Sequence, residues 1–150
     1  MNPCPCGNLL NENLECRCSD LEIQRYKNRL SDPFLDRIDM NVVMQNVKAN
    51  DKASFTSKEL HRKVVEAHMF SKKRGQDSFN AKLNDSDIEK FCILDEEAQG
   101  VLDMAISRFT LSFRSIKKIQ KVGRTIADLD ASEVIKKSHL LEALSYRRRS

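Results

Sequence analysis

The sequence is poor in the residues and segments that mark several classes of protein. It has no tryptophan and no apolar run approaching the roughly 20 residues that a bilayer-spanning helix needs. Its amino terminus lacks the basic and then apolar pattern of a secretory signal peptide. With 40% hydrophobic and 32% charged residues in 150 positions, the composition is that of a globular protein with one ordinary domain or two small ones. We therefore expect a cytoplasmic chain with no membrane partner.

Glycine is also scarce, and this excludes one nucleotide-binding motif. The four glycines, at positions 7, 75, 100 and 123, are scattered, and no Gly-x-x-x-x-Gly-Lys-Ser/Thr occurs. Residues 91–96, FCILDE, imitate the apolar run and acidic pair of a Walker B strand. The run is short, and Asp95 to Glu97 suit the first turn of a helix, so we interpret them as a helix start.

Histidine offers no catalytic arrangement either. His61, His68 and His139 are scattered over expected helices, without convergent ligand spacing or a nearby nucleophile. Together with the missing P-loop, this indicates that the chain carries no self-sufficient catalytic site.

Four of the five cysteines are crowded into the first eighteen residues. Two Cys-x-Cys pairs there could close a tetrahedral zinc site from Cys4, Cys6, Cys16 and Cys18, because thiolates are ligands that zinc prefers. The gap of one residue within each pair is shorter than the usual two to four. Reduced cysteines that merely pack in a loop, or a redox pair, are the alternatives.

Local patterns divide the first half of the chain into short elements. A helix is expected over 20–30, capped by Ser19 or Asp20, and it should end before Asp32-Pro33 because proline disfavours a helical residue before it. Alternation of apolar residues from Ile38 predicts a strand over 38–45. The polar segment 47–55 is the best candidate for a linker between domains.

The second half has the 3.6-residue period of amphipathic helices. Helices are expected over 56–74, from Asn84, from Asp95, from Ser112, and over about 138–146. Their expected apolar faces are Leu60, Val64, Ala67 and Met69; Ile88 and Phe91; Ala98, Val101, Leu102, Ala105, Ile106 and Phe109; Phe113, Ile116, Ile119, Val122, Ile126 and Leu129; and Leu140, Leu141 and Leu144. Helices with short connections predict a bundle, so the fold class is mainly α.

Six motifs in order give the chain a specific resemblance. They are MNPCPCG at 1–7, CRC at 16–18, IQRY at 23–26, RLSDPFLDRID at 29–39, VGRTIADL at 122–129 and HLLEALSYR at 139–147. With them the chain resembles the carboxy-terminal part of the magnesium chelatase-like ATPases of the YifB/ComM family. The resemblance covers nearly the whole chain. The parts of such ATPases that have no counterpart in it are the amino-terminal domain and the Walker A and Walker B strands. Two positions depart from it, since glycine is expected at Asp32 and alanine at Gly123.

This resemblance implies an AAA+ architecture and a motor function. Residues 1–46 would be the end of the AAA+ core, a short α/β remnant with one strand and a Cys-rich loop. Residues 47–55 would be a linker, and residues 56–150 would form a helical lid bundle. Members of the family are homo-hexameric rings that use ATP and Mg²⁺, and those linked to competence drive DNA branch migration. The fragment alone is expected to be inactive as an ATPase.

The resemblance also implies three nucleotide-contacting residues. Asn2 matches the sensor 1 asparagine, Arg37 the arginine finger that reaches the nucleotide of a neighbouring subunit, and Arg114 the sensor 2 arginine of the lid. Positioned guanidinium groups suit phosphoryl transfer, which depends on electrostatic stabilisation. The alternatives are an ion pair of Arg37 with Asp36 or Asp39, and a solvated Arg114 near a helix start.

A second hypothesis is a nucleic-acid-binding module that combines a zinc knuckle with basic helices. The net charge of +4 permits phosphate contacts without requiring them. The cations that would make them are Lys117, Lys118, Lys121, Arg124, Lys136 and Lys137. A metal-inserting chelatase subunit is a third reading, and it is disfavoured because the motifs match the chelatase-like group more closely.

Overall fold

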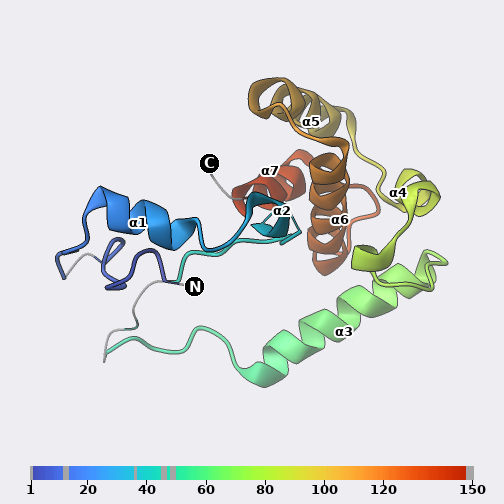
Figure 1. The fold of residues 1–150 in the computed structure, drawn as a ribbon. Coiled ribbons are helices and arrows are strands. Elements are labelled where there is room, and N and C mark those ends of the chain that lie inside the picture. Colours follow the sequence, from blue (N-terminus) through green and yellow to red (C-terminus); the bar gives the residue numbers. More distant parts are fainter. Residues whose placement is uncertain (1, 12–13, 36, 45–46, 48–49, 148–150) are drawn as a thin grey trace. The chain divides into compact units, whose positions relative to one another are not determined.

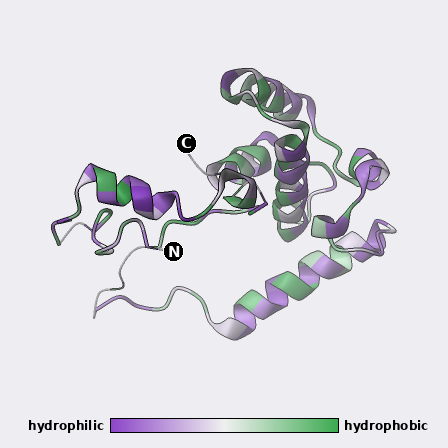
Figure 2. Ribbon diagram, viewed as in Figure 1, coloured by the Kyte–Doolittle hydropathy of each residue, from purple (hydrophilic) through white to green (hydrophobic). Residues whose placement is uncertain are grey.

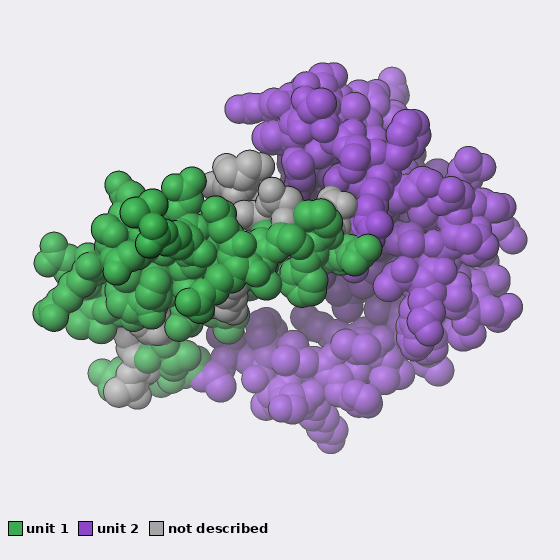
Figure 3. All heavy atoms as spheres, in the orientation of Figure 1, with its two compact units in different colours: residues 1–38, 42–52 green, residues 39–41, 53–150 purple. Residues whose placement is uncertain are grey.

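A computed structural model describes residues 2–11, 14–35, 37–44, 47 and 50–147. The chain forms two compact units, the first of residues 1–38 and 42–52 and the second of residues 39–41 and 53–150 (Figures 1 and 3). The division after residue 52 falls inside the segment 47–55 that the sequence suggested as a linker. We call the first the cysteine unit and the second the helical unit.

The cysteine unit holds two short helices, α1 (Asp20–Lys27) and α2 (Asp32–Leu35). Ser19 caps α1 in a capping box with Glu22, which confirms the expected start, and the helix ends three residues earlier than expected. Pro33 lies in the first turn of α2, where a missing backbone N–H costs nothing. Proline here therefore helps to open a helical turn as well as to separate it from α1.

The strand expected over 38–45 does not form. Residues 38–44 are irregular, residue 45 lies outside the described residues, and the alternating apolar side chains become more exposed along the segment. Ile38 is 37% exposed, Met40 46%, Val42 60% and Met44 85%. Alternation predicts a strand only when a neighbouring strand supplies ladder hydrogen bonds, and the described residues contain no sheet. The mainly α class is confirmed, without the single strand.

The helical unit contains α3 (Ser57–Lys73), the 3₁₀ helix η1 (Asn80–Lys82), α4 (Asp85–Phe91), α5 (Glu96–Phe109), α6 (Phe113–Leu129) and α7 (Lys137–Ser145). In Figure 1, α6 is the central helix of this unit, and it packs against α7, α3, η1 and α4, while α5 packs against α7. Residues 93–95 pass alongside Ile135 through one isolated parallel bridge at Leu94. The stretch that imitated a Walker B strand is therefore a connection, and Asp95 caps α5 as expected.

The core of the helical unit lies between α4, α5, α6 and α7. Its buried residues are Leu83, Ile88, Phe91, Cys92, Ala98, Val101, Leu102, Ala105, Leu111, Ile119, Ile126, Ala127, Ile135, Leu140 and Ala143. Three residues expected in the α5 and α6 faces are exposed instead, since Phe109, Phe113 and Leu129 are 51%, 83% and 48% exposed. Each of them is the first or last residue of its helix.

The apolar stripe of α3 is covered only at its carboxy-terminal end. Leu60, Val64 and Met69 are 50%, 61% and 61% exposed, whereas Ser71 is buried near the contact with α6. Figure 2 shows hydrophobic and hydrophilic residues mixed along this helix. Thr56 caps α3 in a capping box with Glu59, which agrees with the helix expected from residue 56. No helix in the described residues has the length and apolar character needed to cross a membrane.

Candidate functional site

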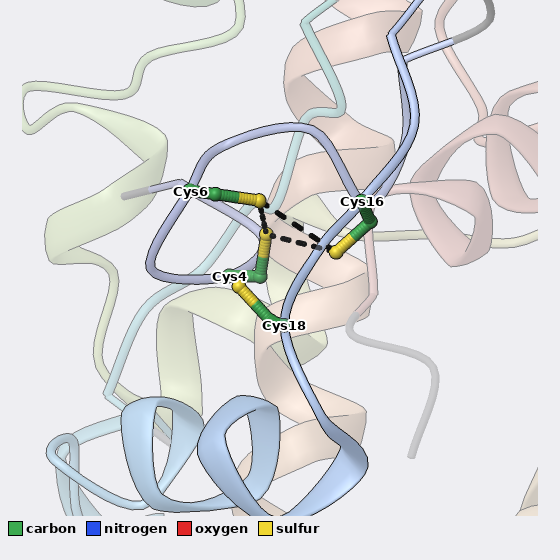
Figure 4. Close-up of side chains that lie close together, drawn as sticks. All are labelled: Cys4, Cys6, Cys16 and Cys18. Carbon is green, nitrogen blue, oxygen red and sulfur yellow. Dashed lines mark hydrogen bonds between the residues drawn. The ribbon is translucent and has the colours of Figure 1, made fainter.

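The four amino-terminal cysteines meet in one loop of the cysteine unit (Figure 4). The Sγ atoms of Cys4 and Cys6 are 3.4 Å apart, and each is 3.7 Å from the Sγ atom of Cys16. With Cys18, all four sulfur atoms lie within 4.8 Å of one another. These separations exceed the roughly 2.05 Å of a disulfide bond, so the cysteines are free thiols. The two Cys-x-Cys pairs thus converge as the sequence suggested.

A tight turn brings the first pair of cysteines to this arrangement. The amide of Gly7 donates to the carbonyl oxygen of Cys4 over 3.1 Å, and Gly7 has a φ of +82°, a conformation that favours glycine. Cys4 is completely buried while Cys6 is exposed. The second pair runs directly into Ser19, the cap of α1, so the helix fixes where that arm ends.

The electrostatics of the loop lower the pKa of Cys6 and raise those of Cys16 and Cys18. Hydrogen bonds from the backbone amides of Asn8 and Arg17, then from the thiols of Cys4 and Cys18, lower the pKa of Cys6 to about 6. A backbone hydrogen bond at Cys6 favours the Cys18 thiolate, but partial desolvation and the neighbouring thiols outweigh it and raise the pKa of Cys18 to about 12. A bound cation is what would stabilise the remaining thiolates together.

The sulfur positions match the donor set of a small tetrahedral metal site. A zinc–sulfur bond of about 2.3 Å places tetrahedral sulfur atoms about 3.8 Å apart. The two separations of 3.7 Å agree with that edge, and the separation of 3.4 Å is slightly shorter. The four cysteines could therefore hold one metal ion with little movement.

Asn2 and Arg37 both lie in the cysteine unit, and both are exposed. The side-chain amide of Asn2 is the nearest neighbour of Gly7, 3.6 Å from the position that a Cβ atom would take there. Asn2 therefore lies against the cysteine loop. In the sequence, only the closeness of Asn2 and Gly7 along the chain indicated that contact.

The backbone of Arg37 continues the helical turn of α2. Its amide donates to the carbonyl oxygen of Phe34 over 3.0 Å, and the next amide, of Ile38, donates to Leu35 over 3.1 Å. Of the two acids expected to pair with Arg37, Asp36 lies outside the described residues. The other, Asp39, forms an ion pair with Lys118 at 3.4 Å.

Arg114 lies in the helical unit as the second residue of α6, and it is exposed. Ser112 caps this helix by accepting from the amide of Ser115. One turn after Arg114 stands Lys118, whose partner Asp39 follows Arg37 by two residues. The ion pair of Lys118 with Asp39 lies within the helical unit.

The cations of the nucleic-acid hypothesis are largely engaged within the helical unit. Lys117 pairs with Asp85 at 2.6 Å, Lys118 with Asp39 at 3.4 Å, and Lys137 with Glu97 at 3.5 Å. The ammonium group of Lys121 donates to the carbonyl oxygen of Ala81 over 3.2 Å. The last of the α6 cations, Arg124, is 0% exposed. Of the six cations named for that hypothesis, five are therefore engaged in ion pairs or hydrogen bonds or are buried.

Sequence reasoning missed a buried charge network around Asp128 on α6. Asp128 is 4% exposed and accepts from Arg74 over 2.7 Å, from Arg124 over 3.1 Å and from Asn80 over 2.8 Å. Arg124 also donates to the carbonyl oxygens of Ser132 and Glu133. The only signal in the sequence was the spacing of Arg124 and Asp128 by four residues, which places them on one helix face.

Comparison with known proteins assigns both units to one family. Residues 54–147 match the family described as magnesium chelatase, subunit ChlI C-terminal, and residues 1–52 match magnesium chelatase, subunit ChlI. The chain is 37% identical over 156 residues to the uncharacterized protein YifB of Escherichia coli, and 36% identical over 152 residues to the competence protein ComM of Haemophilus influenzae.

The YifB protein of Salmonella typhimurium is 35% identical over 156 residues. Each of these alignments includes 98% of this chain and 29% of the relative, so the chain spans less than a third of the length of the proteins it matches. The matched motifs, the two consecutive family regions and the helical second unit agree with one another, and the chain belongs to the magnesium chelatase ChlI-type family that includes YifB and ComM.

Proposed function

We propose that this chain is the sensor, finger and lid part of an AAA+ ATPase, and that it acts in a homo-hexameric ring that remodels DNA. The observation that carries the proposal is the agreement of both units, in order, with the two regions of the magnesium chelatase ChlI family. The similarity to a competence protein supports a role in DNA branch migration or remodelling during competence or recombination. ATP and Mg²⁺ would bind to the whole protein, since the chain has no P-loop.

Within this proposal, three residues contact the nucleotide. Asn2 is sensor 1 and orients the attacking water, Arg37 is the arginine finger for the neighbouring subunit, and Arg114 is sensor 2 of the lid. Phosphoryl transfer places charge on the equatorial oxygens, and a guanidinium group stabilises that charge with a planar pair of donors. All three side chains are exposed, as groups that meet a ligand or another subunit must be.

The proposal divides the chain into three parts, which differ from the two units at residues 39–41, since these cluster with the helical unit. Residues 1–46 supply the end of the AAA+ core, 47–55 connect, and 56–150 form the lid. The lid has its own apolar core, so it can move as a body when nucleotide is exchanged.

The finger role is tested in the intact protein by Arg37→Ala, with Arg25→Ala as the matched control. Arg25 is another exposed arginine of the cysteine unit, on α1. We expect Arg37→Ala to lower ATP hydrolysis by about 10³-fold or more while nucleotide binding stays within a few-fold, because a finger acts on the transition state. Equal loss of binding and hydrolysis would assign Arg37 a structural role. Magnesium-dependent ATP turnover by the isolated 150-residue chain would contradict the proposal as a whole.

We further propose that Cys4, Cys6, Cys16 and Cys18 hold a structural Zn²⁺. The convergence of the four sulfur atoms and the low pKa of Cys6 support it. The ion would tie the arm that begins at Asn2 to the arm that leads into α1. Metal analysis of the chain purified without added zinc should give about one Zn²⁺ per chain. Cys92→Ser, which changes a buried cysteine outside the cluster, should keep it, and a zinc-free wild-type chain would refute the site.

The nucleic-acid-binding module is the alternative, and DNA binding by the isolated chain separates the two. Because the α6 lysines are engaged in ion pairs and backbone contacts, we expect weak binding outside a ring. Tight binding with a steep salt dependence would favour the module instead.

A further inference from the structure

An exposed phenylalanine with two arginines beside it lies at one end of the helical unit. Phe109 is the last residue of α5, and it is 51% exposed. The guanidinium carbon of Arg108 lies 5.7 Å from the centroid of its ring, and that of Arg147 lies 5.6 Å from the same centroid. All three residues belong to the helical unit, so contacts within one compact unit bring them together.

Two helix ends supply these residues. α5 packs against α7 (Figure 1), and the amide of Arg147, just after α7, donates to the carbonyl oxygen of Leu144 over 3.1 Å. At the end of α5, Thr110 takes the left-handed conformation with a φ of 47°, which is uncommon for a β-branched residue. The chain turns there, so that Leu111 is buried while Phe109 stays outside.

The two guanidinium groups are available to an anion. Among the residues that the structure describes, no carboxylate pairs with the side chain of Arg108 or Arg147. The nearest acids along the two helices have other partners, since Asp103 accepts from a glutamine side chain of α5 and Glu142 accepts from the hydroxyl of Tyr146. A helix dipole favours a cation at each helix end, but it does not require both cations to meet beside one ring.

This combination of groups matches the two parts of a nucleotide unit. An exposed aromatic ring stacks on a nucleobase of any identity, and a guanidinium group offers a planar set of donors to phosphate oxygens. The ring-to-cation distances are close to the limit of about 6 Å for a cation–π contact, so the arginines can turn toward a ligand without losing a strong interaction.

We propose that Arg108, Phe109 and Arg147 form a contact site for a single strand of nucleic acid, with a base on Phe109 and the flanking phosphates on the two arginines. A single strand fits better than a duplex, because the faces of paired bases are already stacked on one another and cannot reach the ring. That the strand is DNA rests on the proposed function.

The site is tested in the 150-residue chain by two-dimensional NMR during titration with a short single-stranded oligothymidylate. The amide signals of Arg108, Phe109 and Arg147 should shift, and log K should fall with log salt with a slope of about −1.4, as two phosphate contacts predict. Phe109→Ala should weaken binding about fivefold or more, and Phe109→Trp, which keeps a stacking surface, should bind at least as tightly as wild type. The matched control is Phe55→Ala, which should leave binding unchanged: Phe55 is 58% exposed, with the ammonium group of Lys63 5.1 Å from its ring centroid. Equal affinity of the Phe109→Ala and wild-type chains would overturn the proposal.

A free nucleotide and the terminal arginines are the other sources of such binding, and each has its own measurement. Thymidine monophosphate carries the same base with one phosphate, so the oligothymidylate should bind about tenfold or more tightly. Equal affinity of the two would show a mononucleotide site and refute the strand proposal. A chain that ends at Arg147 removes Arg148 and Arg149, which lie outside the described residues. It should keep the effect of Phe109→Ala, and loss of that effect would also refute the site.

The intact protein separates failure of this site from failure of the proposed function. If Arg37→Ala leaves ATP hydrolysis intact, the finger function fails, whereas the strand site is judged by the Phe109 comparison and stands where that comparison holds. If Arg37→Ala abolishes hydrolysis while wild-type and Phe109→Ala proteins bind the strand equally, the proposed function holds and the strand site is wrong.

Discussion

Removal of the Asp128 carboxylate is the perturbation to which the helical unit should be most sensitive. Asp128 is the shared acceptor of Arg74, at the end of α3, and of Arg124, on its own helix. Arg124 is 0% exposed, and burial lowers its pKa while Asp128 opposes that shift. Substitution by alanine leaves two guanidinium groups facing each other with no anion between them.

The loss in the free energy of unfolding is large because Asp128 is the anion that the two arginines share. Breaking a buried ion pair by deleting one member costs about 3 to 5 kcal/mol, because the other charge stays buried. Alanine regains about 0.5 kcal/mol in helix propensity, which offsets little of this. The loss also frees α3, since Arg74 and Asn80 reach α6 through the same carboxylate. For a domain stable by about 5 to 15 kcal/mol, this is a large fraction of the total.

Urea unfolding followed by far-ultraviolet circular dichroism measures the effect. With a urea m value of about 1.5 kcal/mol per molar, Asp128→Ala should lower the midpoint by about 2 to 3 M. The control is Asp85→Ala, whose pair with Lys117 is short, at 2.6 Å, but whose side chain is 75% exposed. That exposed pair should be worth at most about 1 kcal/mol. If Asp128→Ala shifts the midpoint no more than Asp85→Ala, the reasoning from burial is wrong.

Two further predictions concern packing and thiol chemistry. Gly123→Ala should raise the melting temperature by roughly 4 °C, because an added Cβ lies 3.4 Å from the Cγ2 atom of Ile135 and alanine is favoured over glycine in helices by about 1 kcal/mol; a lower melting temperature would show that this contact cannot relax. In chelator-treated protein at pH 7, an alkylating reagent should modify Cys6 first, since its pKa of about 6 leaves it mostly ionised, and slow as the pH falls below 6. Cys92, whose burial raises its pKa to about 11, should stay unmodified by mass spectrometry until the protein unfolds, and equal labelling of both would contradict the assignment.

Helix starts were predictable because their signals are local. Three capping boxes, headed by Ser19, Thr56 and Asn84, form between residues only three positions apart. Such a pair satisfies the free amides of the first turn whatever the rest of the chain does. The caps of α5 and α6, Asp95 and Ser112, follow the same rule.

Burial was less predictable, because it depends on which neighbour covers a face. Phe113 continues the apolar stripe of α6 and is nevertheless 83% exposed, whereas Arg124, the residue least expected in a core, is 0% exposed. Periodicity predicts that a helix has two faces. It does not predict where the neighbouring helix ends. It also does not predict that Asp128 will be buried beside Arg124 on the same helix and pair with it.

The candidate site likewise has features that local sequence signals predict and features that depend on residues distant in the sequence. The sequence by itself determined where most of the helices begin, the family and the grouping of the four amino-terminal cysteines, because caps, motifs and Cys-x-Cys spacing act over a few residues. Only the tertiary structure decided that residues 38–44 form no strand and that Asp39 pairs with Lys118, 79 positions further along the chain. A strand needs a partner strand, and an ion pair needs a partner charge. Both partners lie far away in sequence, so the fold has to supply them.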